Sequence, residues 1–391
     1  MGGGPAGLYL GILVKRVAPE HEVVIYERNR PVDTFGFGVV FSDATLGNLA
    51  AADPETHAQI TARFARWDDI EIHMGGEALR STGHGFCGIE RKMLLQILQT
   101  RARELGVQLE FEREIRSLSE ITADVIVACD GVASWVREAL AAELEPDVDV
   151  RSNKFVWLGC TVPYEAFTFL FKETPHGLFR VHAYRYHEHG STFIVECRED
   201  TWRTAGLADA DEDRTVAILG EIFAAELAGH KLVKNRSIWR SFPTVRCGKW
   251  HTGNVVLMGD AAHTAHFSIG SGTKLAMEDA IALRDELLGA RGITEALAAY
   301  EAHRRPEVEA LQAAAQASLE WFEGTERYLR MAPVELTYSL MTRSLRVSHA
   351  SVAKRDPHLA RGVERLLAAK VGITMDPPPP PTALPFALGP R

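Results

Sequence analysis

VVLMGDAAHTAHFSIGSGTKLAMED, from Val255 to Asp279, joins a strand, a loop and the start of a helix in one segment. The apolar run 255–258 has the length and β-branched content of a buried strand, and Gly259 and Asp260 end it. Small residues precede the helix: Gly270, Ser271 and Gly272. A carboxylate at a strand end accepts hydrogen bonds from sugar hydroxyls, and glycines at a helix start let backbone N–H groups approach an anionic atom. The segment therefore predicts contacts to a sugar-like chain and to an anionic group of one ligand.

The N-terminus carries a second signal of the same kind. Residues 2–7 read GGGPAG, which contains GxGxxG, and an apolar helical run follows to about Val17. The next strand, 23–26, ends in Glu27, about 20 residues beyond the last glycine, as in the dinucleotide-binding fingerprint. That fingerprint sets a pyrophosphate against the glycine loop and ribose hydroxyls on the acid. We expect nucleotide contacts from these residues: Gly2, Gly4, Pro5, Ala6, Gly7 and Glu27.

One requirement of the fingerprint is not met by the sequence. The motif should follow the central strand of a parallel sheet, but only Met1 precedes Gly2. Either the native chain begins upstream of Met1, or the sheet lacks its middle strand. We expect the upstream start, because a gap in a parallel sheet would leave backbone groups of the neighbouring strands unsatisfied.

A third segment, DVIVACDGVASWVR at 124–137, reads as an apolar strand closed by Asp130 and Gly131. Taken alone, it is explained equally well by a buried strand and a turn. Three segments of nucleotide-binding type in this order are hard to explain by chance, so Asp130 joins the candidate ligand contacts.

These motifs, in this order, resemble the single-component FAD-dependent aromatic hydroxylases, which have the p-hydroxybenzoate hydroxylase fold. Longer blocks resemble the salicylyl-CoA 5-hydroxylases, are similar to the anthraniloyl-CoA monooxygenases, and more loosely resemble the tryptophan-derived hydroxylases of violacein synthesis. The blocks are 27–43, 83–95, 154–159, 182–186, 191–197 and 265–280.

The resemblance implies an α/β fold, α+β overall, with a Rossmann-like FAD-binding lobe, an inserted antiparallel-sheet substrate lobe and a helical C-terminal region. The strand-rich pattern of 155–197 supports the second lobe independently. The expected boundaries are 1–150 for the first part of the FAD lobe (with 70–88 on the substrate side), 151–245 for the substrate lobe, 246–290 for the Gly-Asp segment, 291–375 for the helical region and 376–391 for a proline-rich tail.

Composition narrows the class of protein. The chain has 391 residues, 46% of them hydrophobic, and can bury a large core. Its formal net charge of −9 argues against nucleic-acid binding, which usually shows a basic face. Five cysteines without a CxxC pair indicate free thiols rather than a disulfide framework or a metal site. No run approaches the roughly 18 apolar residues of a membrane span, so we expect a cytoplasmic monomer or homodimer without a membrane partner.

The resemblance also assigns residues to the cofactor. An arginine at the start of a helix, where a cation is disfavoured by the helix dipole, is explained by a nearby phosphate, and Arg91 matches the arginine that the family sets against FAD. A solvated surface position remains the alternative. The further FAD candidates are Arg28, Asp130, Gly259, Asp260, Gly270, Ser271 and Gly272.

The substrate and catalytic candidates come from aromatic and titratable positions in the resembling blocks. An apolar pocket keeps water from the reacting oxygen species, and we expect its walls at Phe37, Val39, Phe41, Phe193 and Phe267. A phenol reacts better as its phenolate, so a base or hydrogen-bond acceptor should lie near it. The candidates for this role are His266, His263, His182 and Tyr184.

The activity implied is hydroxylation of salicylyl-CoA by FAD, NADH or NADPH and dioxygen through a flavin C4a-hydroperoxide, with reduction coupled to occupancy of the substrate site. Alternatives are an anthraniloyl-CoA or indole hydroxylase, or a flavin-dependent reductase without oxygen insertion. A halogenase is disfavoured, because its WxWxIP signature is absent. A cluster of cations near the C-terminus is by default a solvated face, but CoA phosphates also need partners: Arg343, Arg346, Lys354, Arg355, Arg361 and Arg365.

Overall fold

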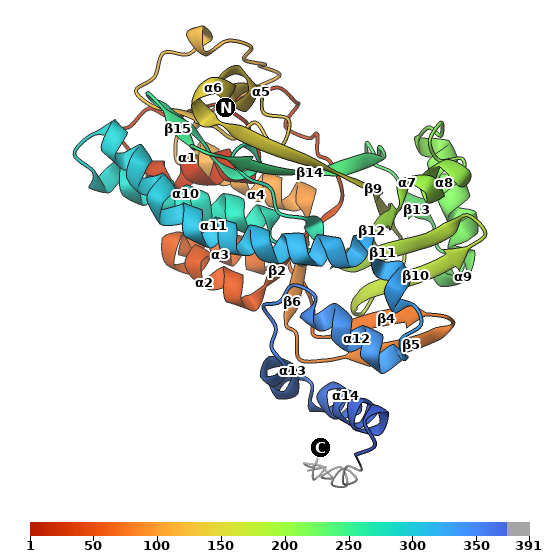
Figure 1. Ribbon diagram of the computed structural model, residues 1–391. Coiled ribbons are helices and arrows are strands. Elements are labelled where there is room, and N and C mark those ends of the chain that lie inside the picture. The colour runs from red at the N-terminus through yellow and green to blue at the C-terminus, as the bar shows by residue number, and fades with distance from the viewer. Residues whose placement is uncertain (374–391) are drawn as a thin grey trace, which may run out of the picture.

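The computed structural model describes residues 1–373, except for the side chains of residues 42–45. The proline-rich tail expected at 376–391 therefore lies outside the described residues. The described chain forms two lobes, each built on its own sheet, with C-terminal helices beneath them (Figure 1).

The first lobe contains a parallel sheet in two parts. One part pairs two strands in parallel, β1 (Val24–Glu27) and β7 (Gln108–Phe111). The other part has β8 (Ile126–Ala128) parallel to β16 (Val255–Leu257), with the short β15 (His251–Thr252) antiparallel at its edge. These runs are short and rich in β-branched residues, as expected for strands covered on both faces.

The backbone of Met1 and Gly2 connects the two parts. The Gly2 N–H donates to the carbonyl of Tyr26 in β1 at 2.8 Å, and the Cys129 N–H, just beyond β8, donates to the carbonyl of Met1 at 2.8 Å. The N-terminal ammonium donates to the Val127 carbonyl at 2.8 Å. Met1 and Gly2 thus occupy the position that a central strand takes in this type of sheet.

Helices α1 (Pro5–Val17), α4 (Arg91–Glu104) and α10 (Gly272–Gly289) pack on this lobe. Leu8 and Ile12 of α1 are fully buried in its core. The shorter elements of the lobe are α2 (Asp43–Ala52), α3 (Pro54–Thr61), α5 (Trp135–Ala139) and α6 (Ala141–Leu144).

The second lobe is an eight-stranded, mostly antiparallel sheet. Its strands are β13 (Leu232–Val233), β9 (Pro146–Cys160), β12 (Gly190–Cys197), β11 (Gly177–His187), β10 (Phe167–Thr174), β4 (Ile70–Met74) and β5 (Glu77–Ser81), in that order, with β14 (Arg240–Cys247) paired to β9. The segment that was expected to contribute to the substrate side, 70–88, supplies β4 and β5.

Side chains alternate between the two faces of this sheet, and the register decides which residues can form a site. His182 lies opposite Ile194 and Phe169, so these three share one face, together with Glu196. That face looks toward the long helix α11 (Ile293–Glu323). Phe193 lies on the other face, which helices cover: α7 (Glu199–Thr204), α8 (Glu212–Ile222) and α9 (Ala224–Leu227).

A small sheet and the C-terminal helices complete the structure. The small sheet has the order β2 (Gly38–Ser42), β6 (Phe86–Glu90) and β3 (Ala65–Trp67). Helix α11 extends from the first lobe to the second, and α12 (Pro333–Thr342), α13 (His349–Arg355) and α14 (Pro357–Lys370) follow it (Figure 1). None of the helices within residues 1–373 is both long and apolar enough to cross a membrane.

The mixed α/β class with a Rossmann-like lobe and an antiparallel substrate lobe is confirmed. Within 70–88, Gly75 and Gly76 turn the chain and make a hairpin of β4 and β5. The same segment leads into β6, whose strand character is obscured in the sequence by the glycines at 83, 85 and 88.

Candidate active site

The glycine fingerprint forms a tight turn into α1. A Cβ at Gly2 would lie 2.2 Å from the carbonyl oxygen of Cys129, and a Cβ at Gly7 would lie 2.3 Å from the carbonyl oxygen of Gly2. Both positions therefore exclude any side chain. A Cβ at Gly4 would meet no atom within 4 Å, so this backbone faces open space at the helix N-terminus. Such an approach is what a pyrophosphate requires.

Glu27 lies beside this turn at the end of β1. Its carboxylate accepts hydrogen bonds from the Gly3 N–H at 2.7 Å and from the backbone and side chain of Asn29, both at 2.7 Å. These bonds fix the acid where the fingerprint sets it against ribose hydroxyls. Arg28 is exposed next to it.

The Gly-Asp motif ends β16 in a single turn of 3-10 helix, Gly259–Ala261. Gly259 has a φ of +64°, and its Cβ would come within 3.3 Å of the Ala276 side chain, so this turn needs a glycine. The turn leaves the side chain of Asp260 exposed. An exposed carboxylate at a strand end can accept hydrogen bonds from the hydroxyls of a ligand.

Asp279 of α10 stabilises this turn through hydrogen bonds. It accepts hydrogen bonds from the Gly259 N–H at 3.1 Å and the Arg304 Nε at 3.0 Å, and Nε2 of His263 lies 2.8 Å from its Oδ2. All these groups except the glycine N–H belong to buried side chains. This placement favours a supporting role for His263 rather than contact with a substrate.

The loop before α10 presents backbone N–H groups. Gly270 adopts a left-handed conformation with a φ of +63°, Ser271 follows, and α10 begins at Gly272 without a side-chain cap. A Cβ at Gly272 would meet nothing within 4 Å. An uncapped helix N-terminus beside open space suits a negatively charged ring edge.

Two polar groups lack partners within the described residues and point to a ligand in this region. The guanidinium of Arg91 has no hydrogen-bond or ion-pair partner in residues 1–373, and burial lowers its pKa while Asp260 opposes that change. Oδ1 of Asp130 is buried and has no partner in the same part of the chain. Buried polar groups are normally paired. Together with the open backbone at Gly4 and Gly272, they fit the phosphates and hydroxyls of FAD.

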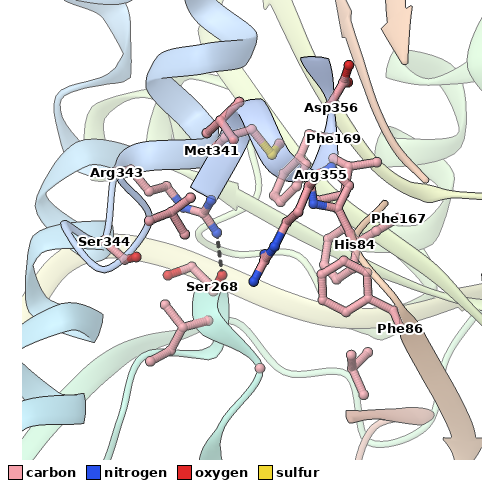
Figure 2. Close-up of a pocket in the computed structure, with 16 residues that line it drawn as sticks. His84, Phe86, Phe167, Phe169, Ser268, Met341, Arg343, Ser344, Arg355 and Asp356 are labelled. Atoms are coloured by element: carbon pink, nitrogen blue, oxygen red, sulfur yellow. Dashed lines mark hydrogen bonds between the residues drawn. The ribbon is translucent and has the colours of Figure 1, made fainter. Parts of the chain in front are cut away.

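A cavity of about 190 Å³ adjoins this loop (Figure 2). Its walls combine aromatic side chains of the sheets, the loop before α10, and the segment from the end of α12 to the start of α14. The residues that matter most for its chemistry are Phe86, Phe167, Phe169, Ser268, Gly270 and Arg343. Because Gly270 lines it, the cavity touches the loop before α10, where the sequence predicts contact with the flavin.

Arg343 supplies a positive charge to this cavity. Its guanidinium donates to the Ser268 carbonyl at 2.6 Å, to Ser318 Oγ at 2.8 Å and to the Leu340 carbonyl at 2.6 Å. It also lies over the rings of Phe169 and Phe322, at 5.6 and 5.3 Å. Burial lowers the pKa of Arg343 to about 10, and no carboxylate in residues 1–373 pairs with it. The cavity therefore favours an anionic or electron-rich occupant.

His266 connects to the cavity through a serine. Its Nδ1 lies 2.9 Å from Ser268 Oγ, which in turn lies 2.7 Å from Ser318 Oγ. Burial lowers the pKa of His266 to about 3, so its ring is neutral. On its other side His266 lines a second, much smaller cavity, which Glu196 also lines.

His182 lies deeper, among aromatic rings. Its ring is 4.6 Å from that of Phe322 and 5.3 Å from that of Phe267, and Nε2 lies 3.4 Å from Oε2 of Glu196. Burial lowers the pKa of His182. Tyr184 donates its hydroxyl to the Gly38 carbonyl at 2.9 Å, which leaves it committed to the fold. Of the four catalytic candidates, only His266 is linked by hydrogen bonds to a residue of the larger cavity.

The structure does not bring the five expected pocket residues to this cavity. Val39 and Phe41 point into the core of the first lobe, whereas Val40 between them lines the cavity. Phe193 packs on Phe223 on the helix-covered face. Phe37 contacts Tyr186, and Phe267 lines the smaller cavity. The alternation of β2 and β12 was the signal that could have separated these faces.

The walls that the sequence reasoning missed are Phe86, Phe167 and Phe169. The last two alternate along β10 in the run FTF, and their register with β11 sets them beside His182 and Tyr184. Arg343 was recognised only as one of several C-terminal cations.

Comparisons with known proteins agree with this geometry. A family model described as an FAD binding domain matches residues 1–315. A salicyloyl-CoA 5-hydroxylase from Streptomyces sp. is 46% identical over 368 residues, which cover 91% of this chain and 71% of that protein. A 3-hydroxy-4-methyl-anthranilyl-[aryl-carrier protein] 5-monooxygenase from Streptosporangium sibiricum is 36% identical, over 82% of this chain and 87% of that protein.

A solved structure supports the fold at lower identity. The tetrameric form of 2-methyl-3-hydroxypyridine-5-carboxylic acid oxygenase has a TM-score of 0.70 and 20% identity, covering 90% of this chain and 96% of that one. The expected resemblance to the salicylyl-CoA 5-hydroxylases is confirmed by the relative from Streptomyces. This chain belongs to the FAD binding domain family and, within it, to the FAD-dependent aromatic monooxygenases.

Proposed function

We propose that this protein hydroxylates the ring of an aromatic CoA thioester, with salicylyl-CoA as the substrate, using NADH or NADPH and dioxygen. The observation that carries the proposal is the aromatic cavity that shares Gly270 with the loop fitting the flavin. The relative named as a salicyloyl-CoA 5-hydroxylase supports the choice of substrate.

Bound FAD would supply the activation of dioxygen and the transfer of one oxygen atom. The groups that would hold it are the backbone at Gly4, the acids Glu27 and Asp260, Arg91, and the N-terminus of α10. The backbone at Gly4 and Gly272 faces open space and Arg91 has no partner in residues 1–373, whereas Glu27 is held by three hydrogen bonds.

The cavity orients the ring and excludes water from it. Phe86, Phe167 and Phe169 present apolar surface, and a single ring fits a volume of about 190 Å³. Exclusion of water limits loss of the activated oxygen.

The polar residues at one end of the cavity favour ionisation of a ring hydroxyl. The charge of Arg343 lowers the pKa of a nearby phenol, because an opposite charge stabilises the ionised form. Ser268 can pass a hydrogen bond from the cavity to His266 or Ser318. A phenolate is the more reactive form of the ring, so this charge contributes to the reaction.

The experiment that tests the proposal measures the anaerobic rate of flavin reduction by NADH and NADPH with different additions. We expect salicylyl-CoA to accelerate reduction strongly, and free salicylate, anthraniloyl-CoA and indole to have little effect. Acceleration by free salicylate or indole, with no effect of the thioester, would overturn the assignment of the substrate.

A further inference from the structure

The cavity is too small to hold the whole of a CoA thioester. Its volume is about 190 Å³, whereas pockets for drug-sized ligands measure about 300–1,000 Å³. An aromatic acyl group fits, but the pantetheine arm and the nucleotide must extend through the opening. Two lining residues are exposed, Gly270 in the loop before α10 and Arg355 at the end of α13, so the cavity reaches the surface at both places (Figure 2 labels Arg355).

Arg355 lines the cavity at the second of these places, and two further cations are close to lining residues along the chain. We call the three the basic rim: Arg346, Lys354 and Arg355. Arg346 lies between Ser344 and Val347, which both line the cavity, and Lys354 precedes Arg355 at the end of α13. All three are exposed.

The basic rim forms no direct ion pair with the part of the chain that the structure describes. None of its three side chains has a hydrogen-bond or ion-pair partner within residues 1–373. The neighbouring acids are committed to backbone groups: Asp356 accepts from the N–H groups of Leu359 and Thr82, at 2.9 and 3.3 Å. Asp68 accepts from those of Gly83 and Gly85, at 3.1 and 2.9 Å.

The segment around the basic rim is also rich in positive charge. Residues 343–370 contain seven lysines and arginines but only two acids, in a chain whose formal net charge is −9. A local excess of positive charge in an acidic protein raises the concentration of anionic ligands at that place.

The backbone that carries Lys354 and Arg355 is held in position. His349 of α13 contacts Tyr338 of α12 and Glu364 of α14, at 3.0 and 2.9 Å. A Cβ at Gly83 would lie 2.5 Å from the carbonyl oxygen of Arg355, so the loop after β5 packs directly on the end of α13. A fixed backbone limits the positions that the side chains of Lys354 and Arg355 can reach, which lowers part of the entropic cost of binding an anion.

We propose that the basic rim binds the phosphates of the CoA nucleotide while the acyl ring occupies the cavity. This inference rests on the proposed function and identifies the part of the substrate that the cavity cannot hold. Arginine forms charge-assisted hydrogen bonds with phosphate, and CoA carries three phosphate groups to match three cations.

The test compares the double variant R346Q/R355Q with a control of equal charge change, R214Q/R291Q. Arg214 on α8 and Arg291 before α11 are exposed and are remote from the cavity lining. Each FAD-loaded protein is assayed with salicylyl-CoA and with salicylyl-pantetheine, which lacks the nucleotide. Binding of adenosine 3′,5′-bisphosphate is measured by calorimetry, and KM is measured for NADH and NADPH.

We expect the rim variant to lose at least tenfold in its preference for the CoA thioester over the pantetheine thioester. It should also bind adenosine 3′,5′-bisphosphate at least tenfold more weakly than the control does. If the wild-type enzyme turns over salicylyl-CoA and the rim variant keeps the same preference for the CoA thioester over the pantetheine thioester, the basic rim does not bind the nucleotide. The proposed function would stand in that case. If wild type turns over no CoA thioester but still binds the bisphosphate through the rim, the proposed function fails alone.

Two other results would overturn this proposal. A rise in KM for NADPH, without a change for salicylyl-CoA, would assign the rim to the reductant. Turnover of a salicylyl group on an acidic carrier protein, with no preference for CoA over pantetheine, would assign it to a protein partner.

Discussion

Arg343 joins the cavity to the loop after the Gly-Asp motif, and its charge has no acidic partner in residues 1–373. We predict that Arg343→Gln raises the pKa of a bound phenolic substrate by about one unit or more, because the stabilising cation is gone. Arg343→Lys should still lower the pKa of the phenol, because the positive charge remains, but the lysine cannot form the three hydrogen bonds that fix the guanidinium. Spectrophotometric titration of bound salicylyl-CoA measures this pKa. The same pKa in wild type and in both variants would exclude Arg343 from substrate ionisation.

His182 and His266 are buried and neutral, and this makes stability depend on pH. In the unfolded chain a histidine binds a proton near pH 6.5, whereas the pKa of folded His266 is about 3. Falling pH therefore favours the unfolded state below about pH 6.5, by at most about 1.4 kcal/mol per pH unit for each histidine. The pKa of Glu196 is lowered to about 2, so this group makes the stability fall with pH only below about pH 4.5.

We accordingly predict that the Tm of wild type falls between pH 7.5 and pH 5, and that His266→Asn reduces this fall. Thermal unfolding at both pH values provides the measurement. The asparagine variant can be less stable at pH 7.5 without affecting the comparison, since only the difference between the two pH values is used. An equal fall in both proteins would show that His266 is not the group responsible.

At the residue scale the sequence was a better guide to the constrained glycines than to the walls of the cavity. Gly2, Gly7 and Gly259 sit where backbone crowding or a positive φ demands glycine, so their spacing carried direct information. Val39 and Phe41 illustrate the opposite case. An aromatic or branched residue in a strand predicts burial, but a one-residue change of register decides which face it joins.

At the scale of elements, the glycine turn into α1 determines how closely a ligand can approach. We predict that Gly4→Ala lowers FAD retention severalfold without lowering the Tm of the apoprotein, because its Cβ would enter open space. The ratio of flavin to protein absorbance after gel filtration measures retention. Gly220→Ala on α8, where a Cβ also meets nothing, is the control. Full retention by Gly4→Ala would argue against pyrophosphate at this turn.

The contact between the loop after β5 and α13 gives a second prediction at this scale. Gly83 and Gly76 have φ values of +81° and +83°, so alanine strains the backbone similarly at both, by about 1–3 kcal/mol. Only at Gly83 would the new Cβ also clash, 2.5 Å from the Arg355 carbonyl. Gly83→Ala should therefore lower the Tm more than Gly76→Ala and weaken binding of salicylyl-CoA. If Gly83→Ala and Gly76→Ala changed the Tm and the binding of salicylyl-CoA equally, the contact between Gly83 and Arg355 would be refuted.

Element types were predicted well where periodicity was long. The strand-rich pattern of 155–197 corresponds to β9, β10, β11 and β12, of which β9 begins earlier, at Pro146, and the helix expected to start at Arg91 is α4. The short strands β6 and β3 were missed, because their stability comes from pairing with each other and with β2 rather than from local preference.

On the scale of the whole molecule, the order of the motifs along the chain predicted the two lobes. The glycine fingerprint and the Gly-Asp turn indicated the first lobe, and the strand-rich segment between them indicated the second. The order could not show that α11 runs from the first lobe to the face of the second (Figure 1). Nor could it show that the segment from the end of α12 to the start of α14 lines the cavity. Those arrangements depend on contacts between distant segments, such as Arg343 with Ser268.

The most direct test of the account is turnover of salicylyl-CoA by the FAD-loaded enzyme under isotopically labelled dioxygen with NADH or NADPH. Mass spectrometry of the product measures the incorporation. We predict a hydroxylated CoA thioester that carries one labelled oxygen atom per ring. An unlabelled product, or consumption of the reductant with hydrogen peroxide as the sole oxygen product, would contradict the assignment of this cavity to aromatic hydroxylation.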